Sequence, residues 1–442
     1  MKYGLFTRAA FFGVAALLAG SVSELRAEDM SALIAQGKYV AEASDCSACH
    51  TVRGRGEFAG GMEFKLPIGS LYSSNITPDP THGIGAYSEA EFSRAVREGV
   101  RRDGASLYPA MPFPSYARMS DGDLHALYVY FMKGVQPVAL AVPPNSIPWP
   151  LSIRLPMTIW RAVFSPSVVA AQKDVNRPLR DDEIERGAYL VEGPGHCGAC
   201  HSPRGMALQE KALSNSNGSL FLSGGAAIDG FVPTSLRQDQ RTGLAGWSED
   251  DIVQFLATGR NRRGEAFGGM TDAIFHGTQH LTDADLHAMA RYLLSLQPHQ
   301  PTLSAWHYDP SAANALQAGD ASAQGAKVYV DHCEACHRSD GRGYAPAFPP
   351  LAGNPVLMSA DPASLVHVVQ SGAVLPGMTK APSAFAMPAY SGILSSQQIA
   401  DVVTFIRKAW GNNAAPVTAA MVEELRKSAP ESAIKKGIIP LN

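Results

Sequence analysis

Three pentapeptides contain the residues most suited to chemistry in this 442-residue sequence. They read Cys46-Ser47-Ala48-Cys49-His50, Cys197-Gly198-Ala199-Cys200-His201 and Cys333-Glu334-Ala335-Cys336-His337, and together they use all 6 cysteines. Two thiols spaced across one helical turn can bond the two vinyl groups of a porphyrin, and the adjacent histidine can bind its iron. The motifs therefore predict three covalently attached haems c.

Other uses of these cysteines fit the sequence less well. With 6 Cys and 13 His in the chain, chance would produce only about 0.002 such pentapeptides. A structural zinc site would pair two C-x-x-C units in one small lobe, whereas these motifs lie more than 130 residues apart. A thioredoxin-like pair needs a βαβ context, and the flanking sequence is typical of helices. Cysteines three apart on a helix are also badly placed for a disulfide.

A methionine is expected on the opposite side of each iron. A haem bound by one histidine is open on its other face, and electron-transfer proteins usually fill that position with a thioether, which raises the reduction potential. One candidate follows each motif, namely Met111, Met270 and Met387. Prolines flank Met111 and follow Met387, and they would stiffen the loop that holds the sulfur, but no proline follows Met270. Met378 is an alternative to Met387, and core packing is an alternative use for any of the 14 methionines.

The elements around the motifs repeat one plan three times. A glycine begins a short helix ahead of each motif, and a helix with apolar residues at i, i+3, i+4 and i+7 closes each unit. The glycines are Gly37, Gly187 and Gly325, and the closing helices cover 124–131, 286–293 and 399–406. Capping residues precede these helices at Ser120, at Thr282 and at either Ser395 or Ser396. A glycine permits close helix crossing, and Tyr130, Tyr292 and Phe405 stand at corresponding positions where an aromatic ring can fill the contact.

This plan resembles the class I cytochrome c fold, in which the first and last helices cross at a glycine and an aromatic residue above the haem. The resemblance implies an all-α protein of three tandem class I cytochrome c domains at 28–140, 175–300 and 315–412. A linker with proline and tryptophan is expected at 141–174, and an amphipathic tail at 413–442. In this fold a proline carbonyl commonly orients the histidine, so Pro67, Pro233 and Pro350 are candidates for that role, or else plain loop residues.

The N-terminal segment of the chain indicates an exported protein. Lys2 and Arg8 precede a short apolar run that ends in Leu25-Arg26-Ala27, which is typical of a signal peptide over residues 1–27. A net charge of −3 and the lack of a Lys/Arg-rich run argue against nucleic acid as a partner. Two stretches, 147–160 with its tryptophans and 417–439 in the tail, could contact a membrane surface or pack on protein.

Three longer segments narrow the family, namely Asn75-Ile76-Thr77-Pro78-Asp79, Gly243-Leu244-Ala245-Gly246-Trp247-Ser248 and Phe405-Ile406-Arg407-Lys408-Ala409-Trp410. They resemble segments of the three-haem cytochrome c subunit of bacterial membrane-bound gluconate, fructose, sorbitol and alcohol dehydrogenases. The resemblance implies a subunit without substrate chemistry of its own, which passes electrons from a large flavin or PQQ subunit to ubiquinone. A small subunit and peripheral contact with the periplasmic face of the inner membrane are implied as well.

Two other functions remain open at the level of sequence. A free-standing cytochrome could feed electrons to a terminal oxidase without a dehydrogenase partner. A haem peroxidase would need one iron without a methionine, and the sequence offers a methionine for each of the three irons.

Overall fold

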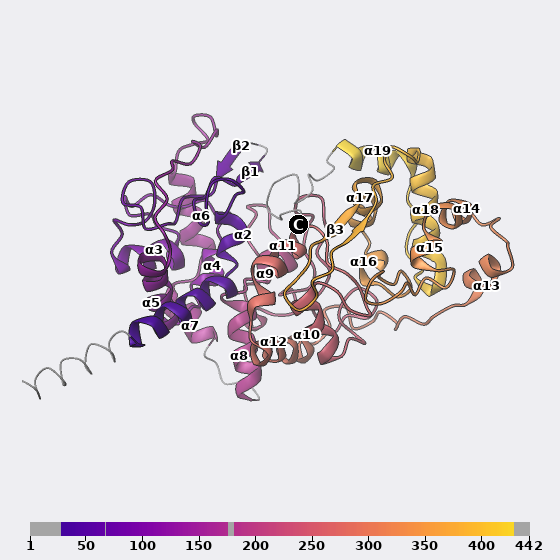
Figure 1. Ribbon diagram of the computed structural model, residues 1–442, viewed down its shortest axis with the longest axis horizontal. Coiled ribbons are helices and arrows are strands. Elements are labelled where there is room, and N and C mark those ends of the chain that lie inside the picture. Colours follow the sequence, from indigo (N-terminus) through magenta and orange to yellow (C-terminus); the bar gives the residue numbers. More distant parts are fainter. Residues whose placement is uncertain (1–27, 67, 176–180, 428–442) are drawn as a thin grey trace, which may run out of the picture.

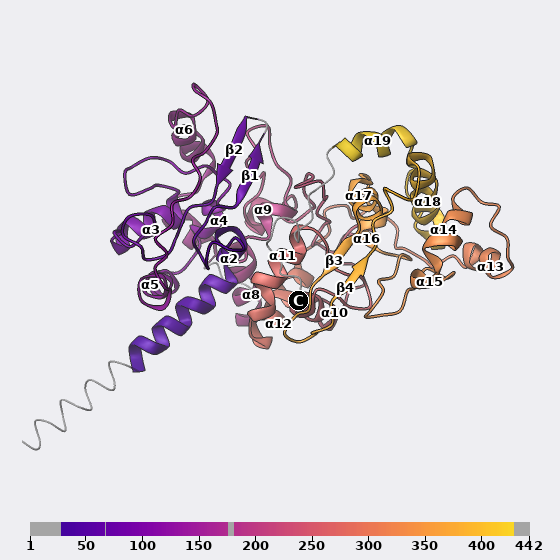
Figure 2. The same cartoon turned by 45° about the horizontal axis from the view of Figure 1, so that its top comes forward.

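The computed structural model describes residues 28–66, 68–175 and 181–427, and in these ranges the protein is built mainly from helices. Figure 1 shows three groups of helices that follow one another along the long axis in the order of the sequence, and Figure 2 shows the same order after rotation. The helix-rich architecture expected from the sequence is therefore confirmed. The expected signal peptide, Pro67 and the end of the tail at 428–442 lie outside the described residues.

Each group of helices encloses its own buried core. The first group comprises the helix at residues 28–43, α2 (Cys46–His50), β1 (Glu63–Leu66), β2 (Gly69–Tyr72), α3 (Glu89–Glu98), α4 (Phe113–Tyr116), α5 (Asp121–Val129) and a π-helical turn η1 (Tyr130–Gly134). The second comprises α8 (Asp182–Glu192), α9 (Gly198–His201), η2 (Asn215–Asn217), α10 (Glu249–Thr258), α11 (Gly269–His276), η3 (Thr278–His280) and α12 (Asp283–Ser295). The third comprises α13 (Ser311–Gln317), α14 (Ala326–His332), α15 (Glu334–His337), α16 (Pro355–Met358), α17 (Ala363–Ser371), β3 (Ala373–Leu375), β4 (Phe385–Met387), α18 (Ser396–Lys408), η4 (Ala409–Gly411) and α19 (Ala419–Lys427). We call these groups the first, second and third units.

The expected crossing of the first and last helices occurs in all three units. A Cβ atom added to Gly37 would lie 2.0 Å from the carbonyl oxygen of Ala126, and one added to Gly187 would lie 2.0 Å from that of Ala288. In the third unit a Cβ on Gly325 would lie 2.1 Å from the carbonyl oxygen of Asp401. No side chain fits at such a distance, so glycine is required for these helices to touch backbone to backbone.

The predicted caps are confirmed as well. The side chains of Ser120, Thr282 and Ser395 each accept a hydrogen bond from the backbone N–H three residues further on. Ser395, rather than Ser396, is the N-cap of α18 and forms a capping box with Gln398. These bonds satisfy N–H groups that a helix leaves without an internal partner.

Several ordered segments differ from the sequence-based expectation. Two short antiparallel hairpins, β1–β2 and β3–β4, were not predicted. The linker contains two helices, α6 (Leu155–Phe164) and α7 (Val168–Val175). The third core extends past both expected boundaries, because α13 contributes Ala313 and the chain beyond residue 412 contributes Val417 and Val422. The described part of the tail therefore packs on its own unit.

The first two units contact each other through two equivalent tyrosines. The Tyr39 hydroxyl donates to Asp285 Oδ2 at 2.5 Å, and the Tyr189 hydroxyl donates to Asp123 Oδ2 at 2.5 Å. Each hydroxyl also accepts a bond at 3.2 Å from the N-cap backbone of the opposite unit's last helix. Because each unit supplies both a tyrosine and an aspartate, the contact has approximate two-fold symmetry.

The helix crossing makes a direct prediction about stability. Gly187→Ala is expected to lower the free energy of unfolding by roughly 1–3 kcal/mol, because its methyl group must push α8 away from α12. The matched control is Gly122→Ala on α5, where the nearest atom to an added Cβ is 4.0 Å away. The control should leave stability equal or raise it by up to about 1 kcal/mol. Thermal unfolding followed by circular dichroism distinguishes the two, and equal effects would contradict the crossing.

Candidate haem sites

Each C-x-x-C-H motif ends in a histidine whose ring is oriented by a backbone carbonyl. His50 Nδ1 lies 2.7 Å from the Ser74 oxygen, and His201 Nδ1 lies 2.7 Å from the Thr234 oxygen. His337 Nδ1 lies 3.0 Å from the Pro349 oxygen. A carbonyl only accepts hydrogen bonds, so Nδ1 must carry the proton. Nε2 of all three rings therefore presents a lone pair that can bind a metal.

The residues that supply these carbonyls differ from the predicted prolines. The carbonyl beside His201 belongs to Thr234, one residue after the predicted Pro233. The carbonyl beside His337 belongs to Pro349, one residue before the predicted Pro350. In the first unit the carbonyl belongs to Ser74, while the candidate Pro67 lies outside the described residues. The sequence does hold a weak signal for the position of these carbonyls in the first two units. Ser74 stands five residues before Asp79, and Thr234 stands five residues before Asp239.

Burial keeps the three histidines neutral. It lowers the pKa of His50, His201 and His337, and the hydrogen bond to the carbonyl only partly offsets that effect. Desolvation disfavours the charged imidazolium, so the neutral ring predominates at neutral pH. A neutral imidazole is the form that binds iron.

The six cysteines are unpaired, and burial raises the pKa of five of them, Cys46, Cys49, Cys197, Cys200 and Cys333. Burial raises the pKa of Cys197 and Cys333 to about 12, and that of Cys49 to the same value. Thioredoxin-like pairs and zinc sites require stabilised thiolates instead. Across the described ranges, no three side chains of His, Cys, Asp or Glu converge as a metal site would require. These thiols therefore suit thioether bonds better than redox or zinc chemistry.

Each candidate methionine shares a buried cluster with the first cysteine of its own motif. Met111 and Cys46 pack against the first core, Met270 and Cys197 against the second, and Met387 and Cys333 against the third. Met111 lies in the turn before α4, Met270 on the first turn of α11, and Met387 at the end of β4. The fold thus brings together three pairs that are 65, 73 and 54 residues apart in the sequence.

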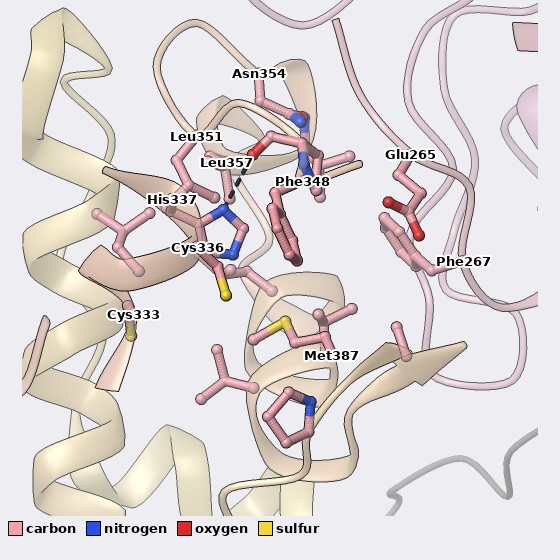
Figure 3. A pocket seen from close by; sticks show the side chains of 18 of the residues that line it. Glu265, Phe267, Cys333, Cys336, His337, Phe348, Leu351, Asn354, Leu357 and Met387 are labelled. Carbon is pink, nitrogen blue, oxygen red and sulfur yellow. Dashed lines mark hydrogen bonds between the residues drawn. The ribbon is translucent and has the colours of Figure 1, made fainter. Parts of the chain in front are cut away.

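A cavity in the third unit shows how these groups are arranged. Figure 3 shows His337 and Met387 bordering the same space, with the Cys336 sulfur beside them and Cys333 at one edge. Its other walls are mainly apolar side chains, including Phe348, Leu351, Leu357, Leu365, Val369 and Ile406. An apolar slot with an imidazole, a thioether and two thiols on its border has the donor set of a covalently bound haem. The residues present therefore fit that group.

Met378 does not compete with Met387 for this position. It is buried against Ala266, Ile274 and Leu375 in a small cluster that joins the second and third units. Met387, by contrast, lines the cavity together with His337. The sulfur of Met387 is thus the one available to a group bound there.

Neighbouring sites also approach one another. Besides burial, the charges of Asp45, Asp272 and Cys200 raise the pKa of Cys49, which places the first and second motifs side by side. The third cavity is completed by Glu265, Ala266 and Phe267, which belong to the second unit and stand just before Met270. Sequence reasoning missed this contribution, because contacts between units leave no periodic signal.

Comparisons with known proteins agree with this geometry. The family model described as cytochrome c matches residues 322–410. The cytochrome c subunit of the quinone alcohol dehydrogenase of Gluconacetobacter polyoxogenes is 55% identical over 424 residues, covering 95% of this chain and 89% of the relative. The gluconate 2-dehydrogenase cytochrome c subunit of Pantoea cypripedii is 51% identical, covering 94% and 95%. The fructose dehydrogenase cytochrome subunit of Gluconobacter japonicus is 34% identical, covering 91% and 84%.

The matched family and the chemistry of the motifs together define a c-type cytochrome. Similarity to the dehydrogenase subunits extends over nearly the whole sequence, well beyond the motifs themselves. The chain belongs to the family of cytochrome c subunits of alcohol, gluconate and fructose dehydrogenases.

The cavity predicts which methionine of the third unit matters to its haem. Met387→Ala is expected to remove the weak near-infrared Fe–S absorption of one haem and to lower that haem's potential, since the thioether stabilises ferrous iron. Met378→Ala should retain the band, although loss of a buried methionine costs about 2–5 kcal/mol of stability. The reverse pattern, with the band lost only in the Met378 variant, would contradict the assignment.

Proposed function

We propose that the chain is the electron-transfer subunit of a membrane-bound dehydrogenase complex and carries three haems c, one in each unit. Thioether bonds would form at Cys46 and Cys49, at Cys197 and Cys200, and at Cys333 and Cys336. The iron ligands would be His50 with Met111, His201 with Met270, and His337 with Met387. The observation that supports this most strongly is the third cavity, because its border holds two cysteines, a neutral histidine and a methionine.

When bound, the haems supply one-electron redox chemistry, and the protein's part is to hold and insulate them. The carbonyls of Ser74, Thr234 and Pro349 fix each histidine ring. Apolar walls exclude water and favour the less charged ferrous state. With a thioether available to each iron, the sites suit electron transfer rather than a peroxidase reaction.

The partners follow from the relatives' names and from the sequence resemblance. A large catalytic subunit with flavin or PQQ would supply the electrons, and ubiquinone would accept these electrons at the periplasmic face of the inner membrane. A small subunit would complete the complex. One relative is named as a quinone alcohol dehydrogenase subunit, which supports a quinone acceptor. A free-standing donor to an oxidase is disfavoured, because the relatives matched over the whole chain are dehydrogenase subunits.

The contacts between units support a relay in which the second haem is central. The helix α2, which holds the first motif, packs against α11 of the second unit, and the charge of Cys200 contributes to the raised pKa of Cys49. The second and third sites adjoin through residues 265–270, since Phe267 lines the third cavity and Met270 packs in the second unit. Electrons entering at either end would therefore cross the second haem.

This relay predicts a strong effect of Met270. Met270→Ala leaves the second iron without its thioether and lowers its potential, so substrate-driven quinone reduction by the intact complex is expected to slow at least about tenfold. The matched control is Met206→Ala in the same unit, because Met206 is fully exposed to solvent. Stopped-flow absorption with the dehydrogenase substrate measures both variants. Unchanged turnover in a Met270 variant that retains all its haems would contradict the central position.

Helix α6 is the segment best suited to contact the membrane. Leu155, Ile159 and Val163 recur every four residues on one face and are 64%, 58% and 65% exposed. Trp149 precedes them and is 80% exposed. Such a face can enter the boundary between lipid headgroups and acyl chains. No helix in the described part of the chain is long and apolar enough to cross a bilayer.

Charges on that face should therefore weaken membrane binding. Leu155→Asp combined with Ile159→Asp is expected to reduce the fraction of protein that floats with phospholipid vesicles by at least about fivefold. Ile393→Asp is the control, because Ile393 is similarly exposed at 63% but lies in the third unit. Equal flotation of the double variant and the wild type would remove α6 from the proposal.

A further inference from the structure

Glu265 brings a carboxyl group of the second unit to the cavity of the third. Among the described residues that line this cavity, it is the only aspartate or glutamate. Figure 3 shows Glu265 and Phe267 on the side of the cavity opposite Cys333. A haem bound between His337 and Met387 would therefore have a carboxyl group from another unit facing its pocket.

The loop that holds Glu265 is fixed to the third unit. Arg260 forms a backbone bridge with Glu265, and its Nη1 donates to the Ser383 carbonyl at 3.1 Å. The Arg260 guanidinium also lies 4.3 Å from the centre of the Phe385 ring. Ala266 is buried against Leu375 in the cluster between the units. These contacts fix the backbone at Glu265 against the third unit.

The surroundings of Glu265 set its protonation. Burial raises the pKa of its carboxyl group to about 7, and the positive charge of Arg260 opposes that shift. From the third unit, the titratable side chains on the cavity are His332, His337, Tyr390 and the two cysteines of the motif. Burial lowers the pKa of His337 and raises that of Tyr390, so both are neutral near pH 7.

We propose that Glu265 takes up a proton when the third haem is reduced and releases it when that haem is oxidised. The inference rests on the proposed function, because it requires a haem in the third unit. Reduction converts ferric iron, one electron, one carboxylate and one proton from solvent into ferrous iron and a carboxylic acid. The iron site loses one positive charge in this step, so it stabilises the neighbouring carboxylate less in the low dielectric of the pocket.

The consequence is a pH-dependent potential for one haem. While Glu265 titrates, the midpoint potential of the third haem falls as pH rises, by at most about 59 mV for each tenfold change in proton concentration. Below that range the carboxyl group is protonated in both redox states, and above it the group is ionised in both. The potential levels off on either side.

Potentiometric titration of the holoprotein, followed by visible absorption from about pH 5.5 to about pH 8.5, tests this. The component of the titration that belongs to the third haem is the one whose midpoint potential shifts in Met387→Ala. Glu265→Gln is expected to flatten the pH dependence of that component at least about twofold, and Glu265→Asp to retain it. Glu210→Gln is the matched control, since burial also raises the pKa of Glu210 to about 7 but its carboxylate lies against Gly198 of the second motif.

The outcomes separate this inference from the function on which it rests. Fewer than three haems per wild-type chain would refute the proposed function itself. Three haems with the same pH dependence in Glu265→Gln would overturn only the role of Glu265. A dependence that disappears in His332→Gln, but not in Glu265→Gln, would assign the proton to His332 and would equally overturn it.

Discussion

The close crossing of two helices at a glycine is the constraint on which each unit depends. At Gly37, Gly187 and Gly325 the chain approaches a carbonyl oxygen of the unit's last helix so closely that no side chain fits. This contact fixes the first helix, and the C-x-x-C-H motif follows within ten residues in every unit. The methionines of the first and third units stand between the motif and the last helix, ahead of α4 and at the end of β4. In the third unit this arrangement brings His337 and Met387 to the same cavity.

The units are also joined in a way that makes the sites interdependent. Tyr39 and Tyr189 exchange equivalent hydrogen bonds between the first and second units, and this arrangement sets the first two motifs side by side. The second and third units are joined differently, because a loop of the second unit forms part of the third cavity. A haem in the third site would thus be surrounded by residues of two units, and its properties would depend on both.

Local patterns predicted much of this architecture. The motifs, the crossing glycines and the caps at Ser120, Thr282 and Ser395 depend on short-range spacing, and the structure has the crossings and the caps as expected. Gly37 and Gly187, however, lie inside their helices instead of beginning them. The candidates Pro233 and Pro350 each miss the orienting carbonyl by one residue, because the partner of a ring nitrogen depends on the path of an irregular loop. The hairpins and the helices α7 and α13 were missed because tertiary contacts, more than local propensity, stabilise such short segments. Glu265 could not be assigned to the third site, since nothing in its neighbourhood encodes a contact with a later unit.

The central claim is that three repeated units each bind one haem through their own cysteines. Mass spectrometry of the holoprotein and of its tryptic haem peptides tests it most directly. We expect the mass of the polypeptide plus three haems, with one haem on each peptide that contains Cys46 and Cys49, Cys197 and Cys200, or Cys333 and Cys336. A chain with fewer haems, or a motif peptide recovered with free thiols, would contradict the account.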